Sequence, residues 1–287
     1  MISLTVLGGY LGSGKTTLLN QLLARNDGRR LAVIVNDFGS INIDERLLQN
    51  FDGDVLSLAN GCVCCSISTG FAETLTALAR RTPPPEHVIV ETSGIANPAK
   101  VALYGGLPPY RLDGIVVVAD AESVRERSTD RYVGESVLRQ LRAADLIVLN
   151  KMDLVAPADR LKLLRWLDET VAGAGVIEAA YGRVPLEALL GLHTAHRKES
   201  GHRDASHEGY QTWNVASDVP VAEATFRADV AAWPTRVLRA KGFVHLTDDP
   251  LQRYLFQLVG RRWSLLPDGE WTGNPRTEIA IIALETQ

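Results

Sequence analysis

The stretch "ISLTVLGGYLGSGKTTLLN", residues 2–20, places a glycine-rich loop between an apolar run and an amphipathic run. Gly9, four further residues and then Gly14-Lys15-Thr16 have the spacing of a P-loop. In such a loop the backbone N–H groups point at phosphate oxygens, the lysine reaches the β- and γ-phosphates and the threonine hydroxyl binds Mg²⁺. A tight glycine turn alone would not explain the lysine. The predicted phosphate-binding residues are Gly12, Ser13, Gly14, Lys15, Thr16 and Thr17.

The sequence around this loop predicts an α/β fold. Near-continuous apolar runs alternate with runs whose apolar residues have helical spacing over residues 1–190. This alternation predicts a P-loop domain with a mostly parallel sheet. Residues 191–209 are polar and are predicted to form a linker, and residues 210–287 are predicted to form a small α+β domain. The linker holds four histidines, for which metal capture and a solvated loop both remain open: His193, His196, His202 and His207.

Composition excludes several classes of partner. The 287 residues include 30 Lys+Arg and 34 Asp+Glu, so the formal charge is −4 and attraction to nucleic acid or to an anionic membrane is not expected. No apolar stretch reaches the length of about 18 residues that a membrane span needs, and no cleavable leader is evident. We therefore expect a soluble, cytoplasmic protein.

The stretch "LIVLNKMD", residues 146–153, indicates which base is bound. After a buried strand, Asp153 can accept from the N1 and N2 donors of guanine, and Asn150 can bond the O6 and N7 edge. Adenine lacks this donor set. Asn150, Lys151 and Asp153 are therefore predicted to bind guanine. A surface turn is the alternative for the motif, and an ATP-dependent small-molecule kinase is the alternative for the protein, which nucleotide preference would separate.

Two carboxylates are candidates to complete a magnesium site with Thr16. Glu91 in "VIVETSG" ends a buried strand, at the edge of the sheet where ligands bind in open α/β folds. Asp37 in "VNDFGSINID" follows the second strand, where a loop that responds to the γ-phosphate is expected. Mg²⁺ keeps several waters, so either acid can act directly or through water. For Asp37, a helix cap or loop turn is an alternative.

All three cysteines of the chain lie in "NGCVCCS", residues 60–66. Cys62, Cys64 and Cys65 follow a turn signal and precede a predicted helix near Thr69, where thiolates are favoured. Three sulfur ligands suit Zn²⁺ or a related late divalent ion, with Co²⁺ next, and leave a fourth ligand unassigned. The alternatives are buried small hydrophobic residues or a redox sensor.

Together these motifs resemble the CobW-type metallochaperone GTPases, relatives of the nickel-insertion GTPases. The resemblance runs nearly end to end and also includes "ETSGIANP", "LRAKGFVHL" and "FQLVGRRWSL". It implies slow, Mg²⁺-dependent conversion of GTP to GDP, with Lys15, Asp37 and Glu91 as the catalytic residues and a metal bound at the three cysteines. Ser40 stands where many relatives have glutamate, and "GVIEAAYGRVPLEALL" lacks the Asn-Pro that often precedes the last guanine-contacting loop.

The resemblance also implies partners. A client metalloprotein or metal-insertion protein would receive the metal, and the working form would be a monomer or a nucleotide-dependent homodimer. Because the cysteines lie between Asp37 and Glu91 in sequence, nucleotide state can control metal affinity. The alternative is a non-enzymatic, zinc-responsive sensor or buffer. Six basic residues suggest a docking surface for the client or a second copy, or a solvated face: Arg236, Arg239, Lys241, Arg253, Arg261 and Arg262.

Overall fold

The computed structural model describes residues 1–25, 28–35, 54–57, 69–191 and 209–285. These residues divide into two compact units, Met1–Leu186 and Glu187–Gln287, which are described separately below.

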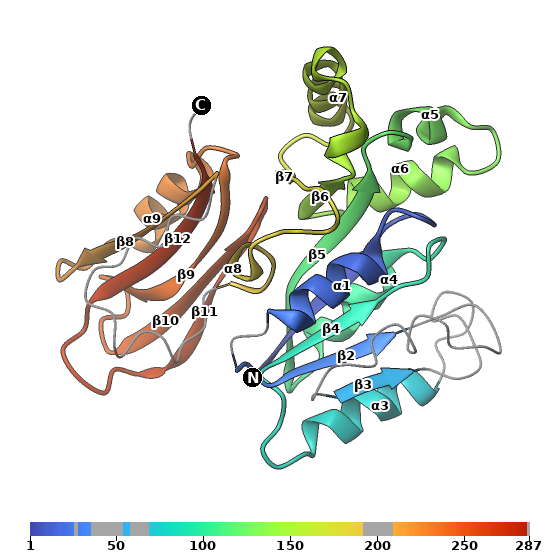
Figure 1. The fold of residues 1–287 in the computed structure, drawn as a ribbon. Coiled ribbons are helices and arrows are strands. Elements are labelled where there is room, and N and C mark those ends of the chain that lie inside the picture. The colour runs from blue at the N-terminus through green and yellow to red at the C-terminus, as the bar shows by residue number, and fades with distance from the viewer. Residues whose placement is uncertain (26–27, 36–53, 58–68, 192–208, 286–287) are drawn as a thin grey trace. The chain divides into compact units, whose positions relative to one another are not determined.

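Unit 1 is built on a seven-stranded sheet, in the order β3-β2-β4-β1-β5-β6-β7 (Figure 1). Every neighbouring pair of strands is parallel. The prediction of an α/β fold with a mostly parallel sheet is confirmed. The strands are β1 (Ile2–Gly8), β2 (Leu31–Val35), β3 (Asp54–Ser57), β4 (His87–Glu91), β5 (Tyr110–Asp120), β6 (Leu146–Asn150) and β7 (Gly175–Glu178).

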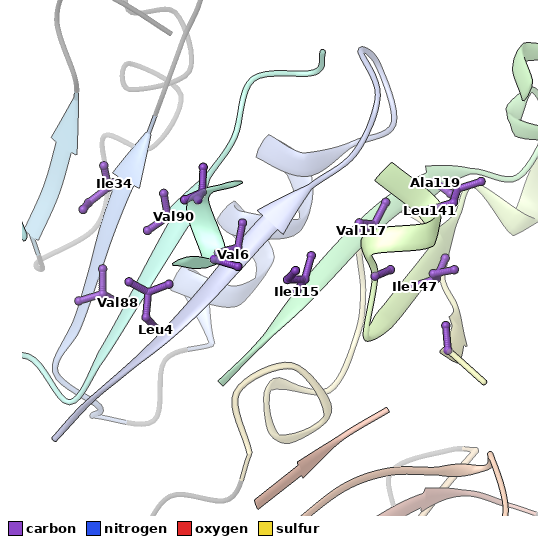
Figure 2. Close-up of a cluster of buried hydrophobic side chains, with 14 of the residues drawn as sticks. Leu4, Val6, Ile34, Val88, Val90, Ile115, Val117, Ala119, Leu141 and Ile147 are labelled. Carbon is purple, nitrogen blue, oxygen red and sulfur yellow. The ribbon is translucent and has the colours of Figure 1, made fainter. Parts of the chain in front are cut away.

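Burial in the core explains why the sequences of these strands are continuous apolar runs. Every residue of β2, β4 and β6 is buried, which requires cover on both faces of the sheet. Figure 2 shows Leu4 and Val6 of β1 next to Val88 and Val90 of β4 in one layer of this core.

The helices of unit 1 connect these parallel strands. Asn97 caps α4 by accepting a hydrogen bond from the Ala99 backbone N–H, and Pro98 follows as the first helical residue. The α-helices are α1 (Lys15–Ala24), α3 (Thr69–Ala79), α4 (Pro98–Ala102), α5 (Val124–Thr129), α6 (Gly134–Ala143) and α7 (Pro157–Thr170), and α8 (Leu186–Leu190) lies at the boundary with unit 2. Two short 3₁₀ helices are η1 (Leu103–Gly106) and η2 (Met152–Leu154).

Unit 2 contains an antiparallel sheet in the order β11-β10-β9-β12-β8 (Figure 1). Helix α9 (Glu223–Ala231) packs on it: the Phe226 ring meets the Phe256 ring edge-on, with centroids 5.0 Å apart. The α+β prediction is confirmed for this part of the chain. The strands are β8 (Tyr210–Ser217), β9 (Val237–His245), β10 (Gln252–Val259), β11 (Arg262–Glu270) and β12 (Thr277–Leu284).

The prediction that the basic residues of this unit form a docking surface or a solvated face is wrong for Arg239. This residue is only 4% exposed, because it lies on β9 and its guanidinium donates to the backbone carbonyls of Ala188 and Leu189. Arg253 is also engaged, in an ion pair with Asp268 at 2.8 Å. The clustering of basic residues in a short region of the sequence did not distinguish a buried structural arginine from a surface one.

Among the described residues, none of the helices combines the length and the apolar character required to cross a bilayer.

Candidate nucleotide site

The loop between β1 and α1 has a backbone that only glycine tolerates at two points. Gly9 and Gly14 have φ values of 140° and 100°. A Cβ at Gly9 would lie 2.3 Å from the Val118 carbonyl oxygen, and one at Gly14 would lie 2.4 Å from Asn150 Nδ2. Gly14 is also the N-cap of α1, so the curled backbone leads directly to the positive end of a helix. This arrangement fits a phosphate group.

Lys15 is the first residue of α1 and its side chain folds back along the loop. It is 9% exposed, and its Nζ donates to the Gly9 carbonyl oxygen at 3.0 Å. The ammonium group is thus held within the loop that would receive the phosphates. In the same segment Ser13 is buried, Thr16 is half-buried, and Gly12 and Thr17 are exposed.

The Gln140 side chain on α6 links the two loops that follow the neighbouring strands β1 and β4. Its Oε1 accepts from the Gly9 N–H, and its Nε2 donates to the Gly94 carbonyl oxygen, both at 2.8 Å. The side chain is 1% exposed. Gly94 is also pressed against the P-loop, since a Cβ there would lie 2.8 Å from the Leu11 backbone nitrogen. One amide therefore links the P-loop to the Glu91–Gly94 segment.

Replacement of this amide gives a first testable prediction. Gln140→Leu keeps a similar volume but leaves a buried N–H and a buried carbonyl unpaired, so we expect the free energy of unfolding to fall by about 1–3 kcal/mol. Urea unfolding measures the change. The matched control is Arg139→Leu, an exposed neighbour on the same helix, which should change stability by less than about 0.5 kcal/mol. Equal stability of the two variants would contradict a role for the Gln140 bridge.

Asn150 holds two further loops together at the end of β6. Its Nδ2 donates to the Ser13 carbonyl oxygen at 3.0 Å, and its Oδ1 accepts from the Gly182 N–H at 2.9 Å. The residue is 2% exposed. The P-loop is thereby tied to the loop that follows β7. The predicted contact of Asn150 with guanine stays a prediction. After the bond to Ser13, one Nδ2 hydrogen of Asn150 remains for such a contact.

Lys151 has a left-handed backbone, with φ of 64°, and its Nζ lies 2.8 Å from Asp120 Oδ2. Burial tends to raise the pKa of the Asp120 carboxyl, but the hydrogen bond and charge of Lys151, together with smaller contributions from Ser123 and the Glu122 backbone, outweigh it and lower the pKa below its usual 3.8. Asp153 follows on η2 and is exposed. The segment thus exposes the Asp153 carboxylate to solvent, next to Lys151, whose ammonium group is held by Asp120.

The lowered pKa of Asp120 gives a prediction about pH. A carboxyl whose folded pKa lies below its unfolded value stabilises the fold above about pH 4, and this contribution is lost as the pH falls through the folded pKa. We expect Asp120→Asn to be less stable than the parent by about 1 kcal/mol at pH 7. The difference should shrink steadily below pH 4. Urea unfolding at a series of pH values measures it, and a difference independent of pH would contradict the ion pair.

Glu91 ends β4 at the carboxyl edge of the sheet, in register with Leu7 of β1 and Val35 of β2. It is 3% exposed, and the next residue, Thr92, donates its N–H to the Leu7 carbonyl. A carboxylate at this edge and the Thr16 hydroxyl at the start of α1 are the oxygen ligands that Mg²⁺ prefers, so the residues present fit the ion.

Several predicted residues lie outside the described residues: Asp37, Ser40, the cysteines Cys62, Cys64 and Cys65, and the four linker histidines. In the parts of the chain that the structure does describe, no group of three His, Cys, Asp or Glu side chains could hold a metal ion.

The sequence analysis did not identify three residues that lie near the site. Gln140 and Asp120 are described above, and the third is Arg127 of α5, whose Nη1 donates to the Leu11 carbonyl at 2.8 Å. All three act on residues at least 31 positions away in the chain. A polar residue on the apolar face of "ESVLRQLRAA" was the one hint, at Gln140.

The parallel sheet and the loop between β1 and α1 define the class: a P-loop nucleotide-binding protein. Residues 3–178 match the family model described as "CobW/HypB/UreG, nucleotide-binding domain", and residues 210–287 match "Cobalamin synthesis protein cobW C-terminal domain". The chain belongs to the CobW/HypB/UreG family, as its sequence motifs predicted.

Relatives extend over almost the whole chain. The chain is 34% identical to a zinc chaperone CobW from Sinorhizobium, over 99% of this chain and 93% of the relative. It is 27% identical to the zinc chaperone YjiA of Escherichia coli, over 99% of this chain and 94% of that one. The crystal structure of the Zn(II)-bound YjiA GTPase from E. coli has a TM-score of 0.50 at 23% identity, again over 99% and 94% of the two chains, and supports the fold.

Proposed function

We propose that this protein is a GTP hydrolase that couples GTP binding and hydrolysis to the binding and delivery of zinc. Its P-loop domain, which we assign to residues 1–190, binds GTP or GDP with Mg²⁺. Cys62, Cys64 and Cys65 hold the zinc, which a client metalloprotein or metal-insertion protein then receives. Cobalt is the second candidate metal.

The observation that carries this proposal is the link through Asn150. One buried amide joins the P-loop at Ser13 to the segment with the guanine-binding motif, so phosphate site and base site form one connected unit. Relatives that cover nearly the whole chain are named zinc chaperones, which supports zinc as the cargo. The three clustered thiols have the ligand chemistry that zinc requires.

Each residue has a role in this proposal. Lys15 and the backbone from Gly12 to Thr17 hold the phosphates, and Thr16, Asp37 and Glu91 provide oxygen atoms around Mg²⁺ and the attacking water. Mg²⁺ supplies charge neutralisation at the phosphates when bound. Asn150, Lys151 and Asp153 bind the guanine. Because the chain segment after β2 lies between the P-loop and the cysteines in sequence, the γ-phosphate can control the geometry of the thiolates.

The test is the zinc affinity of the reduced protein, measured by competition with a chromophoric chelator in the presence of Mg²⁺. GTPγS, GDP and no nucleotide are compared. The proposal requires tighter zinc binding with GTPγS than with GDP, by about 5-fold or more, the range of ordinary coupling between sites. Lys15→Ala should remove the nucleotide dependence and keep the nucleotide-free zinc affinity, whereas Cys64→Ala should lower that affinity. Equal zinc affinity in all three states would favour a zinc-responsive sensor or buffer.

A further inference from the structure

The loop after β7 contains a turn with an unusual residue. The Arg183 N–H donates to the Ala180 carbonyl at 3.1 Å, and the two central residues, Tyr181 and Gly182, have φ values of 55° and 65°. Two positive φ values define a type I′ turn, for which Asn, Asp and Gly are the favoured residues. A bulky tyrosine in the left-handed region is an energetically costly choice.

The turn is fixed in place by its backbone. The Gly182 N–H donates to Asn150 Oδ1, and a Cβ at Gly182 would lie 2.8 Å from the Leu18 nitrogen and Cα. The turn therefore rests directly on the first turn of α1 and on the end of β6. These contacts use the backbone of the turn, and none of them requires a tyrosine.

The Tyr181 side chain itself extends away from the core. It is 62% exposed, and the Arg183 guanidinium carbon lies 5.9 Å from the centroid of its ring. Within the described part of the chain, Tyr181 and Lys151 are the two non-glycine residues with positive φ. The loops that carry them are joined, because the Met152 N–H donates to the Ala179 carbonyl at 3.0 Å. Both conformational exceptions thus lie at the same edge of the sheet: Lys151 is part of the predicted guanine-binding motif, and Tyr181 lies in the turn that packs on the start of α1.

We propose that the Tyr181 ring stacks on the face of the purine base of the bound nucleotide. This inference rests on the proposed function, which places guanine at Asp153. The strained turn holds an aromatic ring in solvent next to the base site, and Arg183 orients the ring. Stacking on an aromatic ring contributes affinity for any base, because every base has a π-face. Tyr181 therefore strengthens binding without selecting guanine, a selection that belongs to Asp153.

The test compares GDP, ADP and inorganic pyrophosphate binding by calorimetry for the parent protein and for Y181A, Y181N and Y181F. Asparagine suits a type I′ turn, so Y181N keeps the loop while it removes the ring. We expect Y181A and Y181N to bind both GDP and ADP about 10-fold more weakly, within the usual range for loss of a stacked aromatic ring. Y181F should bind as the parent does. Pyrophosphate, which has no base, should bind all four proteins equally.

The matched control is Y132N. Tyr132 is also an exposed tyrosine, 79% exposed, with the Arg131 guanidinium carbon 4.6 Å from its ring centroid, but it lies on the segment before α6. Its replacement should leave GDP affinity unchanged. Parent-like GDP affinity of Y181N, or an equal loss of pyrophosphate affinity, would overturn the stacking proposal. A parent protein that fails to prefer GDP over ADP would instead overturn the guanine site, because stacking does not distinguish the purines.

Discussion

An Asp153→Asn variant is expected to lose most of its affinity for GTP and to bind xanthosine triphosphate instead. The Asp153 carboxylate is exposed on η2, and we propose that it accepts hydrogen bonds from two donors of guanine, N1–H and the 2-amino group. The asparagine carbonyl can still accept from N1–H, but its NH₂ group cannot pair with the 2-amino group of guanine, because both are donors. The same NH₂ group can donate to the 2-oxo group of xanthine. Loss of a charge-assisted pair predicts weaker GTP binding by about 100-fold.

The measurement is competition of GTP and xanthosine triphosphate against a fluorescent nucleotide. Asp168→Asn is the matched control, since Asp168 is also an exposed aspartate, on α7, and its replacement should leave both affinities unchanged. If the Asp153→Asn protein still prefers GTP, residues outside the motif recognise the base, and the assignment of Asn150, Lys151 and Asp153 as the guanine-binding residues is wrong.

Asn150→Ala is expected to lower the free energy of unfolding of unit 1 by about 2–4 kcal/mol. The reason is that alanine leaves the Ser13 carbonyl and the Gly182 N–H, both partners of a 2% exposed amide, buried without hydrogen bonds. Nucleotide affinity should fall as well, because Asn150 no longer fixes the position of the P-loop relative to the loop after β7.

Urea unfolding followed by the helical circular dichroism signal measures this change, since most helices in the described part of the chain belong to unit 1. Glu169→Ala, at an exposed position on α7, is the control and should change stability by less than about 0.5 kcal/mol. If Asn150→Ala were as stable as this control, the amide would have to serve the nucleotide alone, as the sequence motif by itself predicted.

The sequence was sufficient for the fold because its signals are local. Continuous apolar runs such as "RLAVIVN" are required wherever a strand is buried on both faces, and the glycines of the P-loop are required by φ values and close contacts that other residues do not allow. Both requirements leave a short, continuous pattern in the sequence that can be recognised directly, even though the atoms that crowd Gly9 and Gly14 belong to the distant residues Val118 and Asn150.

The connections around the site could not be predicted in this way. Gln140 acts on Gly9, 131 positions earlier, and Asn150 acts on Ser13, 137 positions earlier, so their partners depend on the completed sheet. Tyr181 precedes a glycine but gave no sign of its left-handed backbone, which follows from the fit of Gly182 on α1. Arg239 was misread for the same reason, since the carbonyls that bind it belong to α8.

The strand order separates two tasks in space. Strand β1, which leads into the P-loop, has β4, β2 and β3 on one side and β5, β6 and β7 on the other. Glu91 ends β4 in the first group, and the segment that we propose binds guanine begins at the end of β6 in the second group. Under the proposed function, the carboxylate near the γ-phosphate and the groups that bind the base therefore lie on opposite sides of β1. Gln140 connects the two sides, because it lies on α6, between β5 and β6, and bonds both Gly94 after β4 and Gly9 of the P-loop, so a change at Gln140 would disturb the loops on both sides of β1.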